Sequence, residues 1–170
     1  MNLILIGAGG YGQMVCDVAE QSGKYEKILF LDDNKVADNV VGKCADFEKF
    51  ISDDTEFYPA FGNNEARVSF IENLDEKGAK IASIIHKTAY VSPKTVVGKG
   101  VVVLPMAVVN TDTVLETGVL INSSAVVDHG CVIEKGAHIC IGALVKAENR
   151  IPAYMKIEAG EVIQNRTYKV

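Results

Sequence analysis

Two of the three histidines in this 170-residue chain lie nine residues apart, in the segment VVDHGCVIEKGAHICIGA at positions 126–143. Most of that segment is aliphatic, small or glycine, so His129 and His138 are the side chains in it best suited to chemistry. A neutral imidazole takes a proton from an attacking amine or hydroxyl near pH 7, and an imidazole N–H can stabilise an oxyanion. A shared zinc site is a weaker alternative, because this spacing forms no tight ligand pair, and we predict no metal.

A second group of residues has the types that bind phosphate and ribose. GAGGYG at positions 7–12 follows an apolar run, and Asp32 lies twenty residues after Gly12. This order matches the dinucleotide-binding fingerprint, in which glycines let the backbone approach phosphate and the acid binds a ribose hydroxyl. About 85 residues can build only one mononucleotide-binding half. We therefore prefer a nucleotide-sugar over a nicotinamide cofactor or a plain strand-to-helix turn.

The glycine loop belongs to a part of the chain in which strand-like and helix-like segments alternate. We predict strands at 2–6, 27–33, 57–63 and 79–85, and helices over about 10–24, 45–53 and 64–78. Strands that alternate with helices form a parallel sheet with right-handed crossovers.

From Tyr90 onward the pattern has a period of six. A small or β-branched residue mostly precedes each aliphatic position by two, and the aliphatic positions are Val91, Val97, Val103, Val109, Leu115, Ile121, Val127, Ile133, Ile139, Val145, Ile151, Ile157 and Ile163. No helix or flat strand has this period, whereas a six-residue repeat predicts a parallel β-helix with a triangular cross-section. An irregular β-sandwich, the alternative, would show no strict period.

Composition excludes several classes of function. Hydrophobic residues make up 48% of the chain and charged residues 23%, which indicates a globular protein. The net charge of −5 argues against nucleic-acid and anionic-membrane partners. No apolar run approaches the ~18 residues that span a bilayer. The four cysteines match neither a CxxC motif nor a disulfide scaffold, which favours reduced thiols and a cytoplasmic location.

Taken together, these motifs resemble the bacterial hexapeptide-repeat sugar acetyltransferases. The family includes nucleotide-amino-sugar N-acetyltransferases and sialic acid O-acetyltransferases. The matching pieces, in family order over residues 1–143, are ILIGAGGYG, FLDD (30–33), FGNNEARVSF (61–70), IIHKTAYVSP (84–93), the hexads and INSSAVVDHGCVIEKGAHICIGA (121–143). The resemblance implies a homotrimer. A Rossmann-like α/β half-domain, residues 1–86, would bind the nucleotide-sugar, and a left-handed parallel β-helix, residues 87–170, would bind acetyl-CoA between neighbouring prisms.

The resemblance also implies roles for single residues. His129 is expected to be the general base, His138 and Gly142 to contact acetyl-CoA, and Asn122 to lie near the acceptor. Six residues are expected around the nucleotide: Gly7, Gly9, Gly10, Asp32, Asp33 and Asn63. Simpler interpretations remain, because a histidine can be a satisfied surface or core residue and the two aspartates can form a strand-end turn.

Three departures from the family pattern affect these expectations. Gly130 stands where many relatives carry an acidic residue that orients the imidazole, and Asp128 and Glu134 are candidates to replace it. Tyr11 replaces a common histidine in the glycine loop. The tail-like segment IPAYMKIEAGEVIQNR, residues 151–166, begins soon after Gly142. We therefore expect a β-helix shortened by about one to two coils, with weaker contacts to acetyl-CoA.

The sequence thus predicts an enzyme that moves acetyl from acetyl-CoA to an amino group of a nucleotide-linked amino-sugar. Three alternatives stay open: O-acetylation of a sialic-acid-type sugar, a non-catalytic trimer that binds a nucleotide-sugar, and a small nicotinamide-dependent enzyme. The last rests on the glycine loop alone and leaves the hexads without a role.

Overall fold

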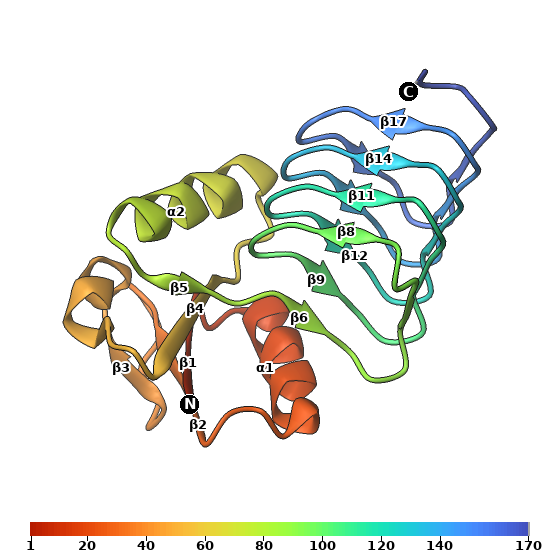
Figure 1. The fold of residues 1–170 in the computed structure, drawn as a ribbon. Coiled ribbons are helices and arrows are strands. Elements are labelled where there is room, and N and C mark those ends of the chain that lie inside the picture. Colours follow the sequence, from red (N-terminus) through yellow and green to blue (C-terminus); the bar gives the residue numbers. More distant parts are fainter. Residues whose placement is uncertain (170) are drawn as a thin grey trace. The chain divides into compact units, whose positions relative to one another are not determined.

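The structure is a computed structural model that describes residues 1–169. It divides into two compact units, Met1–Ala82 and the chain from Ser83 onward, which we call the α/β unit and the prism (Figure 1). The predicted domains, 1–86 and 87–170, divide four residues later. The residues in between include β6 (Ile84–Ile85), which pairs in parallel with β9 (Val102–Val103) of the prism.

The α/β unit is built on a five-stranded parallel sheet, as the alternating pattern predicts. The strand order is β3–β2–β1–β4–β5. Its strands are β1 (Asn2–Ile6), β2 (Lys27–Leu31), β3 (Val40–Gly42), β4 (Thr55–Pro59) and β5 (Lys80–Ile81), and its helices are α1 (Gly10–Ser22), the 3₁₀ helix η1 (Cys44–Phe50) and α2 (Asn64–Glu76). Because β1 pairs with both β2 and β4, its apolar run is buried from its second residue on.

Local sequence explains where α1 lies and where it ends. Val15, Val18 and Ala19 recur at helical spacing and are buried. Gly23 adopts the left-handed conformation, with φ of 66°, and its N–H donates to the Glu20 carbonyl. No helix within residues 1–169 is long and apolar enough to cross a membrane.

The α/β unit differs from the sequence prediction in three elements. The helix expected at 45–53 is a 3₁₀ helix at Cys44–Phe50, and β3, which is only three residues long, was not predicted. The single strand expected at 79–85 is two short strands in different sheets, because β5 pairs with β4 whereas β6 pairs with β9. Apolar residues on both sides of Ala82 and Ser83 made these two strands look continuous.

The prism is the parallel β-helix that the hexads predict, with the left-handed coil that the family resemblance implies, and Figure 1 shows its coils stacked in order. Face 1 contains β6, β9, β12, β15 and β18; face 2 contains β7, β10, β13, β16 and β19; face 3 contains β8, β11, β14 and β17. The remaining bounds are β7 (Tyr90–Val91), β8 (Val96–Val97), β10 (Val108–Val109), β11 (Val114–Leu115), β12 (Leu120–Ile121), β13 (Val126–Val127), β14 (Val132–Ile133), β15 (His138–Ile139), β16 (Leu144–Val145), β17 (Arg150–Ile151), β18 (Lys156–Ile157) and β19 (Val162–Ile163).

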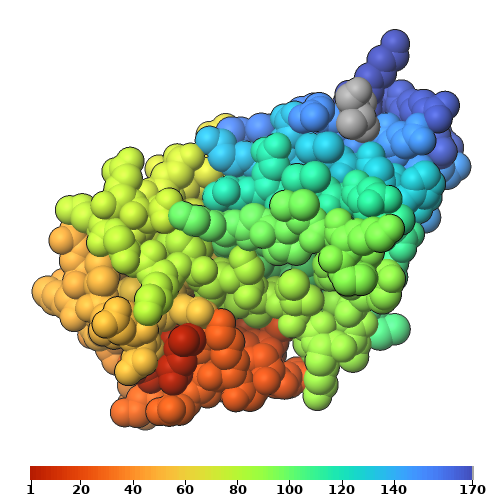
Figure 2. Space-filling view, in the orientation of Figure 1, coloured from red at the N-terminus to blue at the C-terminus, as the bar shows by residue number. Residues whose placement is uncertain are grey.

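Residues eighteen positions apart stack on one another in the prism. Val109 pairs with Val127, which pairs with Val145, and all three are fully buried in the core. The coils follow one another from green to blue in Figure 2. At the corner between faces 2 and 3 the same stacking places four residues with left-handed φ of 57–65° one above another: Asp112, Gly130, Glu148 and Arg166.

Candidate functional site

A cleft of about 540 Å³ opens in the α/β unit at the carboxyl ends of β1, β2 and β4. Ligands of open α/β sheets bind at this edge, where neighbouring connections leave the sheet in opposite directions. All six residues predicted to surround a nucleotide line the cleft: Gly7, Gly9, Gly10, Asp32, Asp33 and Asn63. The structure therefore brings together residues that the sequence spreads over more than fifty positions.

The glycines of the loop serve two different purposes. A Cβ on Gly12 would lie 2.1 Å from the Gly7 carbonyl oxygen, so Gly12 lets α1 pack closely on the loop. Gly7 itself has φ of 102°. A Cβ on Gly9 or Gly10, in contrast, would meet no atom within 4 Å, and neither residue has a left-handed φ. Among residues 1–169, no packing contact therefore requires glycine at these two positions, and their bare backbone lines the cleft.

The N-terminus of α1 is suited to an anion. Its N-cap, Gly9, makes no side-chain hydrogen bond, and the first turn carries no acidic residue. The first backbone N–H groups of a helix have no intrahelical acceptor, and the helix dipole places partial positive charge there. A phosphate group placed at Gly9 and Gly10 would accept from these donors.

Asp32 ties the glycine loop to the end of β2. Its Oδ2 accepts a hydrogen bond of 2.8 Å from the Ala8 N–H, and its Oδ1 accepts from the N–H groups of Asn34 and Lys35 at 2.9 and 2.8 Å. These backbone donors, Ala8 first, lower the pKa of Asp32. The strand-end turn is therefore present, and it holds an ionised carboxylate at the wall of the cleft.

Asp33 and Asn63 also make local bonds. The Asp33 carboxylate accepts from the Cys44 N–H at 3.0 Å, and the Lys43 ammonium group donates to the Asp33 carbonyl oxygen. Asn63 caps α2, because its Oδ1 accepts from the Ala66 N–H at 2.8 Å. Each of these predicted ligand residues thus has a structural role in shaping the cleft wall.

Sequence reasoning missed a buried polar group beside the cleft. Arg67 is fully buried and donates to the Phe61 carbonyl oxygen at 3.0 Å and to the Asn64 Oδ1 at 2.9 Å. Tyr11 and Tyr58 share a hydrogen bond of 2.6 Å between their hydroxyls, and burial raises the pKa of both.

Arg67 supports the wall of the cleft formed by residues 61–64. The burial of Arg67 could have been predicted from the sequence, because Arg67 lies at helical spacing from the buried Ile71 and Leu74. Such spacing places all three side chains on one face of α2.

In the prism, His129 is exposed at the corner between faces 2 and 3, just after β13. Its backbone N–H donates to Asp128 Oδ1 at 2.8 Å, and that oxygen also accepts from Asn110 Nδ2 at 3.1 Å. The bond from the His129 N–H is the main reason that the pKa of Asp128 is lowered. Glu134, the other candidate to orient the imidazole, instead accepts from Arg150 at 2.9 Å and from the Ala153 N–H at 3.0 Å.

His138, Asn122 and Gly142 come together on face 1 and the corner that follows it. Asn122 Oδ1 accepts from the Ser123 N–H at 2.8 Å, so the Asn122 amide nitrogen is the donor to His138 Nε2, at 3.2 Å. With Nε2 accepting, the proton of a neutral His138 ring sits on Nδ1. Gly142 has φ of 64°, and a Cβ on it would meet no atom within 4 Å.

The two histidines lie on different sides of one prism. The chain visits face 1, face 2 and face 3 in turn, so the corner between faces 2 and 3, which carries His129, is opposite face 1, which carries His138. One chain therefore does not present both imidazoles to one small molecule. Within residues 1–169, no group of three or more His, Cys, Asp or Glu side chains is placed to hold a metal ion.

Known proteins resemble this chain over nearly its whole length. Residues 2–74 match the family model described as the PglD N-terminal domain. The acetyltransferase domain of PglB from Neisseria gonorrhoeae shares 35% sequence identity with a TM-score of 0.94, over 97% of this chain and 83% of that one. The same domain in complex with acetyl coenzyme A has a TM-score of 0.93 at 35% identity, over 97% and 82% of the two chains.

Two further proteins are more distant. PerB from Caulobacter crescentus, in complex with CoA and GDP-perosamine, has a TM-score of 0.84 over 100% of this chain and 92% of that one. Its identity is 23%, so this likeness concerns the fold. An uncharacterized protein of Acanthamoeba polyphaga mimivirus is 32% identical over 101 residues, or 56% of this chain, and the chain spans 20% of that protein's length.

Proposed function

Because the chain belongs to the bacterial hexapeptide-repeat sugar acetyltransferases, we propose that it moves acetyl from acetyl-CoA to the amino group of a nucleotide-linked amino-sugar. The observation that carries the proposal is the cleft of the α/β unit, which gathers all six expected nucleotide residues around an uncapped helix N-terminus. The PglB domain that binds acetyl coenzyme A, at 35% identity, supports acetyl-CoA as the donor.

His129 is the general base of the proposed reaction. The amine nitrogen attacks the thioester carbonyl carbon while His129 takes a proton from that nitrogen. The carbon–sulfur bond then breaks, and the CoA sulfur leaves with the electron pair and receives the proton from the imidazolium. The exposure of His129 supports this role, because an acceptor can reach its ring.

His138 and Gly142 contact acetyl-CoA in this proposal, and Asn122 sets the His138 ring. The bond from the Asn122 amide to Nε2 keeps the proton of a neutral His138 ring on Nδ1, and it is this tautomer that meets acetyl-CoA in the proposed complex. Gly142 leaves the neighbouring backbone uncovered, so that a long, narrow pantetheine chain can lie against it.

The site is assembled from more than one copy of the chain, in a homotrimer. The opposite placement of His129 and His138 supports this, because a cyclic assembly joins two different surfaces of neighbouring copies, as a site with one histidine from each copy requires. The outward positions of face 2 are also apolar: Tyr90, Val108, Val126, Leu144 and Val162. Such an apolar stripe marks a surface for another protein chain.

The test follows thiol release from acetyl-CoA with a panel of UDP- and GDP-linked amino-sugars. We expect release that depends on the sugar, and a loss of about 10²–10⁴-fold in His129→Ala, the usual range for a general base. Mass spectrometry of the product, before and after mild alkali, distinguishes an amide from an ester. A folded, trimeric protein that releases no thiol with any acceptor would refute the transferase, and full activity of His129→Ala would refute the assigned base.

A further inference from the structure

The ring of His129 needs a neighbour that holds it, if it is the general base assigned above. An exposed imidazole on a turn rotates freely, and a catalytic side chain works only when a second group fixes its orientation. Asp128 and Glu148 are two carboxylates whose charge interacts with that of His129. The Asp128 carboxylate is bound to the backbone of the turn, whereas the Glu148 carboxylate is not.

Asp128 is committed to the turn itself. Its Oδ1 accepts from the backbone N–H of His129 at 2.8 Å and from Asn110 Nδ2 at 3.1 Å. The first bond lies within the turn, and the bond from Asn110 connects the turn to the preceding coil. Asp128 therefore places the backbone of His129 rather than its ring.

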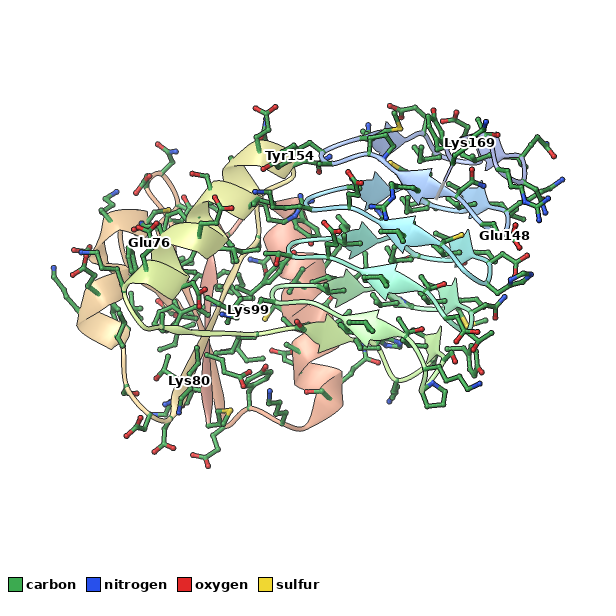
Figure 3. All side chains as sticks on the ribbon, turned by 45° about the horizontal axis from the view of Figure 1, so that its top comes forward. Glu76, Lys80, Lys99, Glu148, Tyr154 and Lys169 are labelled. Carbon is green, nitrogen blue, oxygen red and sulfur yellow. The ribbon has the colours of Figure 1, made fainter. Side chains whose placement is uncertain are left out.

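Glu148 reaches the same turn from the following coil. It lies eighteen residues after Gly130, and its N–H donates to the His129 carbonyl oxygen at 3.1 Å. A Cβ on Gly130 would lie 3.6 Å from Glu148 Cγ, so the stem of Glu148 runs directly over the residue that follows His129. Figure 3 shows Glu148 at the outer edge of the stacked coils.

Arg166 holds the Glu148 carboxylate from one coil further on. It stacks at the same corner with the same left-handed conformation, and its Nε donates to Glu148 Oε2. Its segment is anchored by the fully buried Asn149, whose Nδ2 donates to the Gln164 carbonyl oxygen at 2.8 Å and whose Oδ1 accepts from the Tyr168 N–H at 2.9 Å.

We propose that Glu148 is the positioning residue of His129, and that Arg166 keeps the Glu148 carboxylate in place for that role. The carboxylate accepts from one ring N–H of His129, which leaves the other nitrogen to take the proton of the acceptor. It also stabilises the imidazolium that results. The inference rests on the proposed general base, but the contact can be tested without turnover.

The first experiment is carbethoxylation of the histidines by diethyl pyrocarbonate, measured over pH for each histidine by peptide mass spectrometry. Neutral imidazole reacts, so each pH midpoint reports loss of the ring proton. In Glu148→Gln we expect the His129 midpoint to fall by about half a pH unit or more, because an opposite charge nearby favours the protonated ring. His86 and His138 in the same protein are internal controls, and their midpoints should not move.

The second experiment is steady-state kinetics with acetyl-CoA and the accepted sugar. Glu148→Gln should lower kcat about tenfold with little change in either KM, whereas Glu148→Asp should recover part of the loss. Arg166→Gln should also lower kcat, although removal of its positive charge cannot lower the midpoint of His129. If Glu148 and Arg166 affected His129 only through their charges, Glu148→Gln and Arg166→Gln would change kcat in opposite directions.

Asp128→Asn is the matched control for the neighbouring carboxylate. An unchanged His129 midpoint in Glu148→Gln would overturn the proposal. A His129 midpoint that falls in Asp128→Asn but not in Glu148→Gln would overturn it as well. Circular dichroism and native mass spectrometry confirm that each variant is folded and assembled. If the midpoint shifts in a protein that transfers no acetyl group, the contact stands and the proposed function fails.

Discussion

At the scale of single residues, two glycines of the same loop are present for different physical reasons. Gly12 is required by the fold, because a Cβ there would lie 2.1 Å from a backbone oxygen. Gly10 has open space around it and occupies the first turn of α1. Only the second kind of glycine leaves room that a ligand can use.

Alanine substitutions separate these two reasons. Gly12→Ala should destabilise the protein by about 1–3 kcal/mol or more, the cost of an overpacked site. Gly10→Ala should leave stability unchanged or raise it by about 0.5–1 kcal/mol, because alanine favours helix. It should nevertheless weaken nucleotide binding. Denaturant unfolding measures the first effect, and calorimetry with UDP and GDP the second; undiminished binding by Gly10→Ala would contradict the role of the loop.

Asp32 makes the stability of the α/β unit depend on pH. Its pKa is lowered in the folded protein by the N–H donors of Ala8, Lys35 and Asn34. Its stabilising effect is therefore complete above the unfolded pKa of about 3.9, and is lost as the pH falls through the lower folded pKa. Asp32→Asn should cost about 1–3 kcal/mol at pH 7.

The difference in unfolding free energy between wild type and Asp32→Asn should therefore shrink at pH 3. Urea unfolding at both pH values measures it. A difference that is equally large at pH 3 would show that the charge of Asp32 is not what matters.

At the scale of elements, each two-residue strand of the prism has one inward and one outward side chain. In β14, Ile133 is fully buried and Val132 faces outward. Coil stacking repeats this arrangement, so the inward aliphatic positions form one continuous core. Stability is thus expected to depend on the hexad position far more than on residue type.

Ile133→Ala should lower the free energy of unfolding by about 2–5 kcal/mol, the usual cost of a large-to-small change in a core. Val132→Ala, in the same strand, is the matched control and should cost much less. Urea unfolding of both variants measures the difference. Equal losses would mean that the outward surface is as tightly packed as the core.

At the scale of the whole molecule, the proposed site takes His129 from one subunit and His138 from another. Variants His129→Ala and His138→Ala, unfolded together and reassembled, should then regain activity that neither has alone. With random mixing, about a quarter of the interfaces would carry both intact histidines in a cyclic assembly. Thiol release measures the recovery. No recovery in verified mixed trimers would place both histidines in the site of a single chain or in different sites.

Local patterns in the sequence determined much of this protein. The period of six sets which residues face the prism core, because a coil that closes on itself must place an apolar side chain inward on each face. The spacing of the dinucleotide-binding fingerprint assigned the glycine loop and Asp32 to one site, and the family resemblance added Asn63. The carboxyl ends of parallel strands meet at one edge of a sheet, which is why these residues line one cleft. Two features of short segments could not be predicted: the existence of β3, and the division of residues 79–85 into β5 and β6. Both depend on which distant strand each segment pairs with, and the local sequence does not show this.

Only the tertiary structure decided which groups meet across the coils and within the α/β core. Glu148 lies over Gly130 because coils stack at eighteen residues, a separation at which no local pattern links the two. The Tyr11–Tyr58 hydrogen bond and the bond from the buried Arg67 to the Phe61 carbonyl oxygen likewise depend on packing between elements. The structure also placed His129 and His138 on opposite sides of one prism, because three faces follow each other in turn. Periodicity determines which way a side chain faces, whereas its neighbours depend on how distant segments pack.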